Sequence, residues 1–338
     1  MKRLAITLQQ LAARENLLLA VAKAARGKRQ RPEVARWLAE LEPRLADLAQ
    51  GIMDQTVPSG RMRRFTIHDP KTRVISTTSF ADRVLHHAIL NLAEPRFEKM
   101  LVDSSFACRP GLGVHAAVAA VQRHLRRFDW WVQVDVAGYF ASIDHGLLRG
   151  LLARRFKGEG LLALLGRIIA RGAPAGAGCG LPIGALSSQH FANAYLDAAD
   201  RWLLARPDVQ AHVRYMDDIV WWCASRDQAQ SVLAGFRVWL ALHLRLQLKP
   251  QARVGRSAQG IAFCGFRVRR GVVLPSARKQ RRFRQGARAW MRAFHEPGTA
   301  EGDLQRAHEV LQATLAHTRS VEFRRRVWAR VGGYSEPP

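Results

Sequence analysis

Two adjacent aspartates stand between two apolar stretches in the segment 214–222, which reads RYMDDIVWW. The flanking residues are mostly aromatic or β-branched, so the segment predicts a β-hairpin with Asp217 and Asp218 at its tip. Two carboxylates this close repel each other, and a divalent cation that prefers oxygen ligands is the natural compensating charge. The alternative is an acidic turn without chemistry, in which the aspartates bond to their own backbone.

A third aspartate ends a second apolar stretch. Residues 130–136 read WWVQVDV and predict a strand with Asp135 near its end. A carboxylate on a central strand is costly to bury without a partner, so Asp135 is the next candidate acid. The alternative is an aspartate that caps the following turn. Aspartates converging from neighbouring strands could bind two divalent ions about 3.5–4 Å apart, as in phosphoryl-transfer enzymes.

The composition points to a polyanionic partner. The 338 residues include 53 lysines and arginines against 27 acidic residues, a net charge of +26. This balance favours nucleic acid over a membrane surface. No signal peptide or transmembrane stretch is expected, because the longest uncharged run is interrupted by glycine, proline and polar residues. The four cysteines form no Cys-x-x-Cys pair, which fits a reducing cytoplasm.

Apolar periodicity predicts the elements that would position these acids. We expect helices in residues 1–55, 82–94, 113–127, 147–171, 191–202 and 227–244, with short strands at 246–249 and 261–268. A hairpin over 61–76 carries five basic residues, which suit a triphosphate or a nucleic-acid backbone. A charge-protected edge strand is the alternative for that hairpin. From Ser276 the sequence becomes strongly basic and helical, so we place a boundary near Pro275.

Several motifs resemble those of reverse transcriptases, in the family order, over roughly residues 60–275. They are the Tyr-x-Asp-Asp box at Tyr215–Asp218, the first palm motif at Asp135–Asp144, the primer grip at Phe263–Phe266, and the fingers motifs at Arg73–Ile75 and Asp82–Arg83. The resemblance implies an α+β fold laid out as a right-hand polymerase with fingers, palm and short helical thumb. It also implies RNA-directed DNA synthesis with two Mg²⁺ ions, or Mn²⁺ in their place.

The resemblance divides the chain into parts of the hand. These are N-terminal helices and fingers at 1–128, palm at 129–146 and 181–275, a fingers/palm helical insertion at 147–180, and thumb at 276–338. Gly265 and Phe266 would press on the primer end. The basic thumb helices would clamp an RNA–DNA duplex through its backbone.

The resemblance also implies roles for single residues near the acids. Asp135 and Asp217 would be the principal metal ligands. The carbonyl of Val136 would lie nearby, and Asp218 would support the site. Lys249 occupies the region of a lysine that serves the family as a proton donor.

Nucleotide binding falls to other residues by the same resemblance. Arg73, assisted by Lys71 or Arg64, would hold the triphosphate of a dNTP. Phe140 lies where the family has a bulky aromatic that excludes the ribose 2′-hydroxyl and so favours deoxynucleotides. The alternative for Phe140 is a plain core residue.

A narrower resemblance rests on residues 183–189, which read IGALSSQ. By resemblance, Ile183, Gly184 and Gln189 would be nucleotide-binding residues. Most reverse transcriptases have Gln-Gly-x-x-x-Ser-Pro here, whereas the form in this chain resembles the enzymes of diversity-generating retroelements. Those enzymes copy a template-repeat RNA into cDNA with errors mainly opposite adenines, and they work with a small basic accessory variability protein, expected to be oligomeric. Ile183 cannot supply the hydrogen bonds of the usual glutamine, which should weaken discrimination between bases. A packing substitution is the alternative.

Two other interpretations remain. A retron or group II intron type of reverse transcriptase is disfavoured by Gln189 and by the expected lack of a maturase, RNase H or endonuclease extension. A non-catalytic RNA-binding scaffold is disfavoured because it gains nothing from clustered aspartates. The expected location is the cytoplasm of a bacterium or archaeon, with a phage-encoded origin as a further option, and without membrane attachment.

Overall fold

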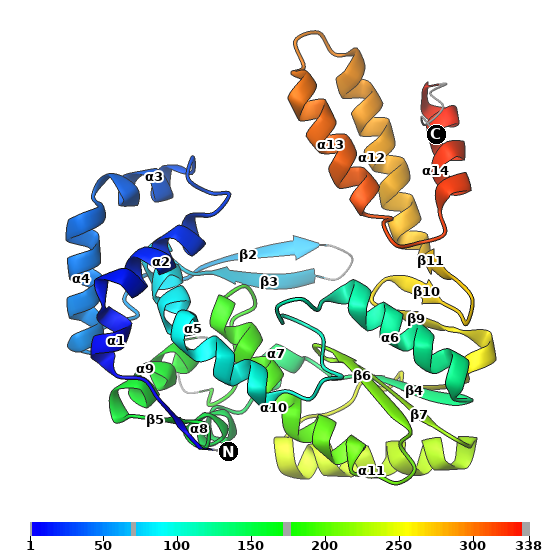
Figure 1. Ribbon diagram of the computed structural model, residues 1–338, viewed down its shortest axis with the longest axis horizontal. Helices are drawn as coiled ribbons and strands as arrows, with labels where there is room; N and C mark the ends of the chain where they lie inside the picture. Colours follow the sequence, from blue (N-terminus) through cyan, green and yellow to red (C-terminus); the bar gives the residue numbers. More distant parts are fainter. Residues whose placement is uncertain (1, 69–71, 172–176, 333–338) are drawn as a thin grey trace.

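The computed structural model describes residues 2–68, 72–171 and 177–332, without the side chains of Thr72 and Arg73. Helices and predominantly antiparallel sheets occur together, which confirms the α+β class. Figure 1 shows three regions: N-terminal helices with a projecting hairpin, a central sheet, and a C-terminal helical bundle that stands over one end of that sheet. No helix in the described ranges is both long and apolar enough to cross a membrane.

The central sheet has the strand order β6-β7-β4-β8, and every neighbouring pair is antiparallel. Its strands are β4 (Trp130–Asp135), β6 (Ala211–Tyr215), β7 (Asp218–Cys223) and β8 (Arg253–Arg256). Strands β6 and β7 form the hairpin that the sequence predicts. Because side chains alternate between the faces of a strand, Trp221 packs into one core and Trp222 into another.

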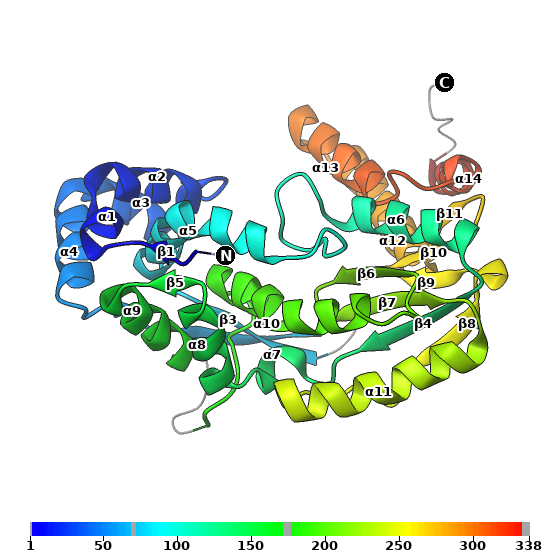
Figure 2. The same ribbon diagram turned by 60° about the horizontal axis from the view of Figure 1, so that its bottom comes forward.

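Helices cover both faces of this sheet, as Figure 2 shows. Helix α11 (Arg226–Leu244) and α10 (Leu186–Leu204) pack on the Trp221 face, and α6 (Val114–Arg127) packs on the Trp222 face. Helix α10 is buried along nearly its whole length. It lies between the sheet and the N-terminal helices and contacts both.

The N-terminal region packs around a long helix. Helix α5 lies against α2 and α10, and the hairpin β2–β3 projects beside it. The bounds are α1 (Leu8–Ala12), α2 (Arg14–Ala25), α3 (Pro32–Ala39), α4 (Leu41–Met53), β2 (Arg63–His68), β3 (Thr72–Thr77), α5 (Phe80–Met100), α7 (Tyr139–Ser142), α8 (His145–Ala153) and α9 (Glu159–Ala170). Two short strands that the sequence did not predict, β1 (Leu4–Ala5) and β5 (Phe156–Lys157), pair in parallel.

The C-terminal bundle has its own small core of buried residues, which are Phe283, Ala287, Met291, Leu311, Leu315, Val327 and Trp328. Its helices are α12 (Ala277–His295), α13 (Glu301–Ala313) and α14 (Val321–Gly332). Ser276 caps the first of them, since its hydroxyl accepts a hydrogen bond from the Lys279 amide. A three-stranded sheet connects the bundle to the rest, with β9 (Ile261–Phe263), β10 (Phe266–Val268) and β11 (Val273–Pro275).

Two strand predictions need correction. Residues 246–249 are not a strand, because only Leu248 bridges to Val136 beyond the end of β4, and the paired strand is β8 instead. The predicted strand 261–268 is two strands. Cys264 and Gly265 both have positive φ, 48° and 78°, and turn the chain back on itself. The helical segment predicted over 147–171 forms two helices, α8 and α9, with β5 between them.

Candidate active site

The three candidate aspartates lie at one end of the central sheet. Asp135 ends β4 and stands opposite Asp218, which begins β7. Residues paired in this way have Cβ atoms about 4.5–5.5 Å apart. Asp217 precedes Asp218 in a two-residue turn with Met216, whose φ of 54° is unusual for a side chain other than glycine. The strand register therefore gathers the three carboxylates that the sequence singled out.

Asp218 is a carboxylate with too little positive charge around it. Burial raises the pKa of Asp218 to about 7, and the charges of Asp135 and Asp217 act in the same direction. Gln133 opposes the shift, because its Nε2 donates to Asp218 Oδ1 at 2.9 Å. The same amide also donates to the Ala262 carbonyl at 3.0 Å, which ties β9 to this carboxylate.

Asp135 has a cation beside it. Lys249 Nζ donates to Asp135 Oδ1 at 2.8 Å, and the Lys249 amide donates to the Asp135 carbonyl at the same distance. The Asp135 side chain is 49% exposed, so it remains accessible from solvent. The predicted proton-donor lysine thus lies directly at the candidate site.

The donor chemistry of this cluster suits a divalent cation. Carboxylate oxygens are the ligands that Mg²⁺ prefers, and burial together with the neighbouring charges of Asp135 and Asp217 disfavours the charged form of Asp218. In the described residues, however, no three acidic, histidine or cysteine side chains already converge on one metal position. Two of the carboxylates are instead hydrogen-bonded to Lys249 and Gln133.

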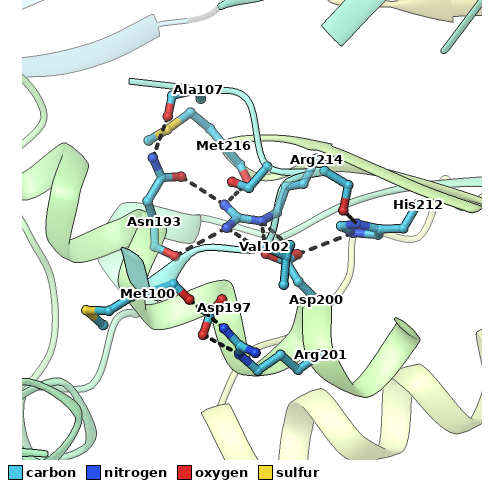
Figure 3. A network of polar contacts seen from close by, with 12 residues as sticks. Met100, Val102, Ala107, Asn193, Asp197, Asp200, Arg201, His212, Arg214 and Met216 are labelled. Carbon is cyan, nitrogen blue, oxygen red and sulfur yellow. Dashed lines mark hydrogen bonds and ion pairs between the residues drawn. The ribbon is translucent and has the colours of Figure 1, made fainter. Parts of the chain in front are cut away.

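A buried arginine supports the turn from behind, as Figure 3 shows. Arg214 lies in β6 with its side chain 0% exposed, and it forms an ion pair with Asp200 of α10. Its backbone also pairs with a segment outside the sheet: the Arg214 amide donates to Ser104 and its carbonyl accepts from Phe106. The sequence analysis missed this residue, although a charged residue within an otherwise apolar strand was a visible signal.

The predicted triphosphate-binding residues lie on the projecting hairpin. Arg64 is exposed on β2, opposite Ser76 of β3. Lys71 lies outside the described residues, and Arg73 is described only by its backbone in β3. Phe140 is half-buried on α7, close after Asp135, with its ring edge-on to Tyr139 at 5.7 Å.

Ile183 and Gly184 meet the same hairpin from the other side. The Ser76 amide donates to the Ile183 carbonyl at 2.8 Å. Gly184 has a φ of 111°, and a Cβ there would lie 2.6 Å from the Ser76 carbonyl oxygen, so only glycine fits. Gln189 lies one turn into α10, where its Oε1 accepts from the Cys108 thiol at 3.4 Å. The side chain of Gln189 therefore contacts the 104–109 segment.

The turn between β9 and β10 comes next to the aspartates. The Cys264 amide donates a hydrogen bond to Asp218, and Gly265 follows it. The ring of Phe266 is buried, and Lys279 Nζ lies 4.2 Å from its centroid. Phe266 therefore anchors the turn through packing, and Gly265 is exposed at the surface.

The C-terminal bundle carries a groove between α12 and α14. It encloses a cavity of about 320 Å³ whose charged lining residues are Arg284, Arg288, Arg326 and Arg330. Arg284 lies over the ring of Phe323, 5.1 Å from its centroid. None of these four arginines pairs with a carboxylate of the described residues. A row of unpaired guanidinium groups is a surface for phosphates.

The chain belongs to the reverse transcriptase (RNA-dependent DNA polymerase) family, because a model of that family matches residues 67–268. This range contains the aspartate cluster, both strands of its hairpin and the β9–β10 turn.

Curated relatives match over parts of the same region. The group II intron-encoded protein LtrA of Lactococcus lactis subsp. cremoris is 26% identical over 171 residues, 48% of this chain and 28% of that protein. Protein YkfC of Escherichia coli (strain K12) is 28% identical over 146 residues, 40% of this chain and 38% of that protein. Nuclear intron maturase 2, mitochondrial, of Arabidopsis thaliana is 24% identical over 137 residues, 36% of this chain and 19% of that protein. The matches span well under half the length of each relative.

Proposed function

We propose that this chain is an RNA-directed DNA polymerase built as a right hand. The observation that carries the proposal is the pairing of Asp135 with Asp218, with Asp217 in the adjoining turn, inside the region that matches the reverse transcriptase family. In this interpretation the central sheet is the palm, the hairpin β2–β3 belongs to the fingers, and the C-terminal bundle is the thumb. The boundaries that we propose between these parts are the ones expected from the sequence.

Two divalent ions, Mg²⁺ or Mn²⁺, fit the proposed chemistry. Asp135, Asp217 and the Val136 carbonyl would hold them, with Asp218 in support. Bound there, such ions would supply charge compensation for nucleotidyl transfer. Lys249, which contacts Asp135, would deliver a proton to the leaving group. Phe140 would exclude a ribose 2′-hydroxyl beside the same strand.

The thumb would bind the RNA–DNA duplex through its backbone. The arginine groove between α12 and α14 supports this, because none of its four guanidinium groups pairs with a carboxylate of the described residues and the chain has a net charge of +26. Arginine binds phosphate oxygens through two parallel hydrogen bonds and tolerates any sequence. On the fingers side, Arg64, with Lys71 and Arg73, would hold the dNTP triphosphate.

We further propose that the enzyme is of the diversity-generating retroelement class. Ile183, Gly184 and Gln189 carry this proposal, since they depart together from the usual Gln-Gly-x-x-x-Ser-Pro form. The substrate would be a template-repeat RNA, copied with errors at adenines in the cytoplasm. The partner would be a small basic accessory variability protein. Its basic character means that it would meet this basic chain through shared RNA rather than by charge attraction.

A group II intron type of enzyme is the second candidate. It is favoured by the relatives, since LtrA is described as group II intron-encoded and the Arabidopsis protein as an intron maturase. This candidate keeps the same polymerase site. It differs from the first candidate because it predicts accurate copying and a template other than a template-repeat RNA.

Primer extension tests the polymerase proposal directly. The wild-type chain with Mg²⁺, a primed RNA template and the accessory protein should yield cDNA, whereas Asp217→Ala should yield none while retaining its fold and RNA binding. Loss of a ligand that acts only in the chemical step lowers the rate without a matching loss of substrate affinity. Undiminished synthesis by Asp217→Ala would refute the proposed metal site.

Sequencing the cDNA separates the two classes. Errors concentrated opposite template adenines favour the diversity-generating class, and accurate copying favours the intron class. Ile183→Gln should lower the adenine error frequency, because it restores a hydrogen-bonding side chain. Ile183→Val is the matched control and should leave the error spectrum unchanged. If Ile183→Gln also leaves the error spectrum unchanged, residue 183 does not set fidelity.

A further inference from the structure

The side chain of Arg214 is buried three residues before Asp217. Both it and its partner Asp200 are 0% exposed. Taking two charges out of water is costly, and a well-packed apolar pair would often be as stable. This buried ion pair is therefore weak evidence for added stability, and its hydrogen bonds are the guide to its role.

The guanidinium group of Arg214 is held on all sides, as Figure 3 shows. Its Nε lies 2.8 Å from each oxygen of Asp200, and its Nη2 lies 2.7 Å from Oδ2. Its Nη1 donates to the Asn193 side chain at 2.9 Å and to the Met216 carbonyl at 3.2 Å. Burial favours the neutral form of Asp200, but the charge of Arg214 and the contacts with His212 and Arg214 together outweigh it and lower the pKa of this carboxyl.

The bond to the Met216 carbonyl connects this network to the chemistry. Met216 occupies the left-handed region, with a φ of 54°, and its carbonyl joins directly to the amide of Asp217. A strained turn persists only where its surroundings hold it in place. Rotation of this peptide would turn Asp217 away and would break the bond to Arg214.

Asn193 extends the network to a second element. Its side-chain carbonyl accepts from Arg214, while its Nδ2 donates to the Ala107 carbonyl at 2.6 Å. Helix α10 thus holds both the hairpin turn and the 104–109 segment, through Asn193 and through Asp200.

His212 and Ser104 complete the network without forming a hydrolytic triad. His212 Nε2 lies 3.3 Å from Asp200 Oδ1, and Ser104 Oγ lies 2.8 Å from His212 Nδ1. The side chains of His212 and Asp200 are 0% exposed, and Asp200 is already bonded to Arg214. A substrate cannot reach His212 or Asp200, so these two side chains support Arg214 instead.

We propose that Arg214 is a positioning residue that fixes the direction of Asp217 by gripping the turn from inside the protein. The inference rests on the proposed polymerase function. Arginine suits this task because its planar fork can bond Asp200, Asn193 and Met216 together, which a lysine ammonium cannot do in the same geometry.

The test is Arg214→Lys, which keeps the charge beside Asp200 and loses the fork. We expect kcat for primer extension to fall about 100-fold, since a misplacement of about 1 Å has that effect. The Mg²⁺ concentration for half-maximal rate should rise about tenfold, with KM for dNTP and affinity for primed RNA within about twofold of wild type. Arg201→Lys is the matched control. Arg201 pairs with Asp197 on the same helix and donates to the Met100 carbonyl, away from the turn.

Asn193→Ala serves if Arg214→Lys does not fold. It leaves the Arg214–Asp200 ion pair in place and removes one orienting bond, so a roughly tenfold fall in kcat with a raised Mg²⁺ requirement is expected. A variant with lowered thermal stability but wild-type kcat and Mg²⁺ dependence would overturn the inference. The failures remain distinguishable: an inactive wild-type chain counts against the polymerase proposal, whereas an active wild type matched by an equally active Arg214→Lys counts against positioning alone.

Discussion

Arg214 in the central sheet and the arginines of the C-terminal bundle are in opposite surroundings. Arg214 is fully buried and bonded to Asp200, Asn193 and Met216. Arg326 and Arg330 are exposed along a groove, and among the described residues no carboxylate pairs with them. The same side chain is fixed by the protein in one region and left for a partner in the other.

The difference separates two uses of positive charge. A buried guanidinium with every donor occupied can hold a turn still, but it offers nothing to a ligand. An exposed guanidinium binds a phosphate, but it adds little to stability. Substitutions in the two regions should therefore divide cleanly between stability and nucleic-acid affinity.

The largest expected effect is on folding. Asp200→Ala leaves the charge of Arg214 buried without its partner, which should lower the free energy of unfolding by about 3–5 kcal/mol. Urea denaturation measures this. Asp303→Ala is the control, because it breaks an exposed ion pair with Arg306 in the bundle and should cost at most about 0.5 kcal/mol. Equal losses in the two variants would remove the contrast between the regions.

A second effect on stability should come from His86, a buried histidine whose pKa is not raised by any carboxylate of the described residues. Burial lowers the pKa of His86 to about 4, and nearby His87, Arg83 and Arg171 add to the shift. The unfolded chain then takes up the proton first, so stability should be retained above about pH 6.5 and fall towards pH 4. The loss from His86 is on the order of 3 kcal/mol.

His86→Gln tests this origin of the pH dependence. The variant should show a shallower fall in the free energy of unfolding between pH 6.5 and 4, while exposed His243→Gln should keep the wild-type slope. An unchanged slope in His86→Gln would assign the acid sensitivity to other groups.

Substitutions in the C-terminal bundle should have the smallest effect on the free energy of unfolding. They should nevertheless clearly weaken duplex binding. Arg326→Gln with Arg330→Gln should change stability by less than about 0.5 kcal/mol. The slope of log affinity for duplex against log salt should become shallower by about 1.8, because each phosphate contact contributes about 0.9. Arg226→Gln with Arg237→Gln, two exposed residues of α11, is the charge-matched control. An identical salt slope in both double variants would mean that only net charge matters.

The sequence predicted the parts of the site that are local in the chain. The hairpin at Asp217 and Asp218, the strand that ends at Asp135, and most helices follow from apolar periodicity. The pairing of Asp135 with Asp218 depends on strand order, which periodicity does not contain. The sequence therefore predicted that the aspartates could converge across neighbouring strands, but not which residues pair.

Long-range polar contacts could not be predicted in the same way. Asp200 and Asn193 are polar residues on a helix, and nothing in their spacing shows that they meet Arg214 in the interior. The side-chain carbonyl of Gln189 accepts from Cys108, over 80 positions away in the chain, and no local pattern indicates that contact. The strand expected at 246–249 was also wrong, because backbone pairing in that segment ends after one bridge.

The backbone contacts of Ser104 and Phe106 with Arg214 have a consequence for self-association. Strand β6 is the outermost strand on its side, and an uncovered outer strand can pair with a strand of another molecule. The 104–106 segment occupies the backbone donor and acceptor of Arg214 on this side and so covers the end of β6 next to the turn. On the other side, β8 is only four residues long and carries Arg253 and Arg256, whose charges repel a second copy. The sheet that holds the aspartates is thereby protected at both margins against growth into aggregates.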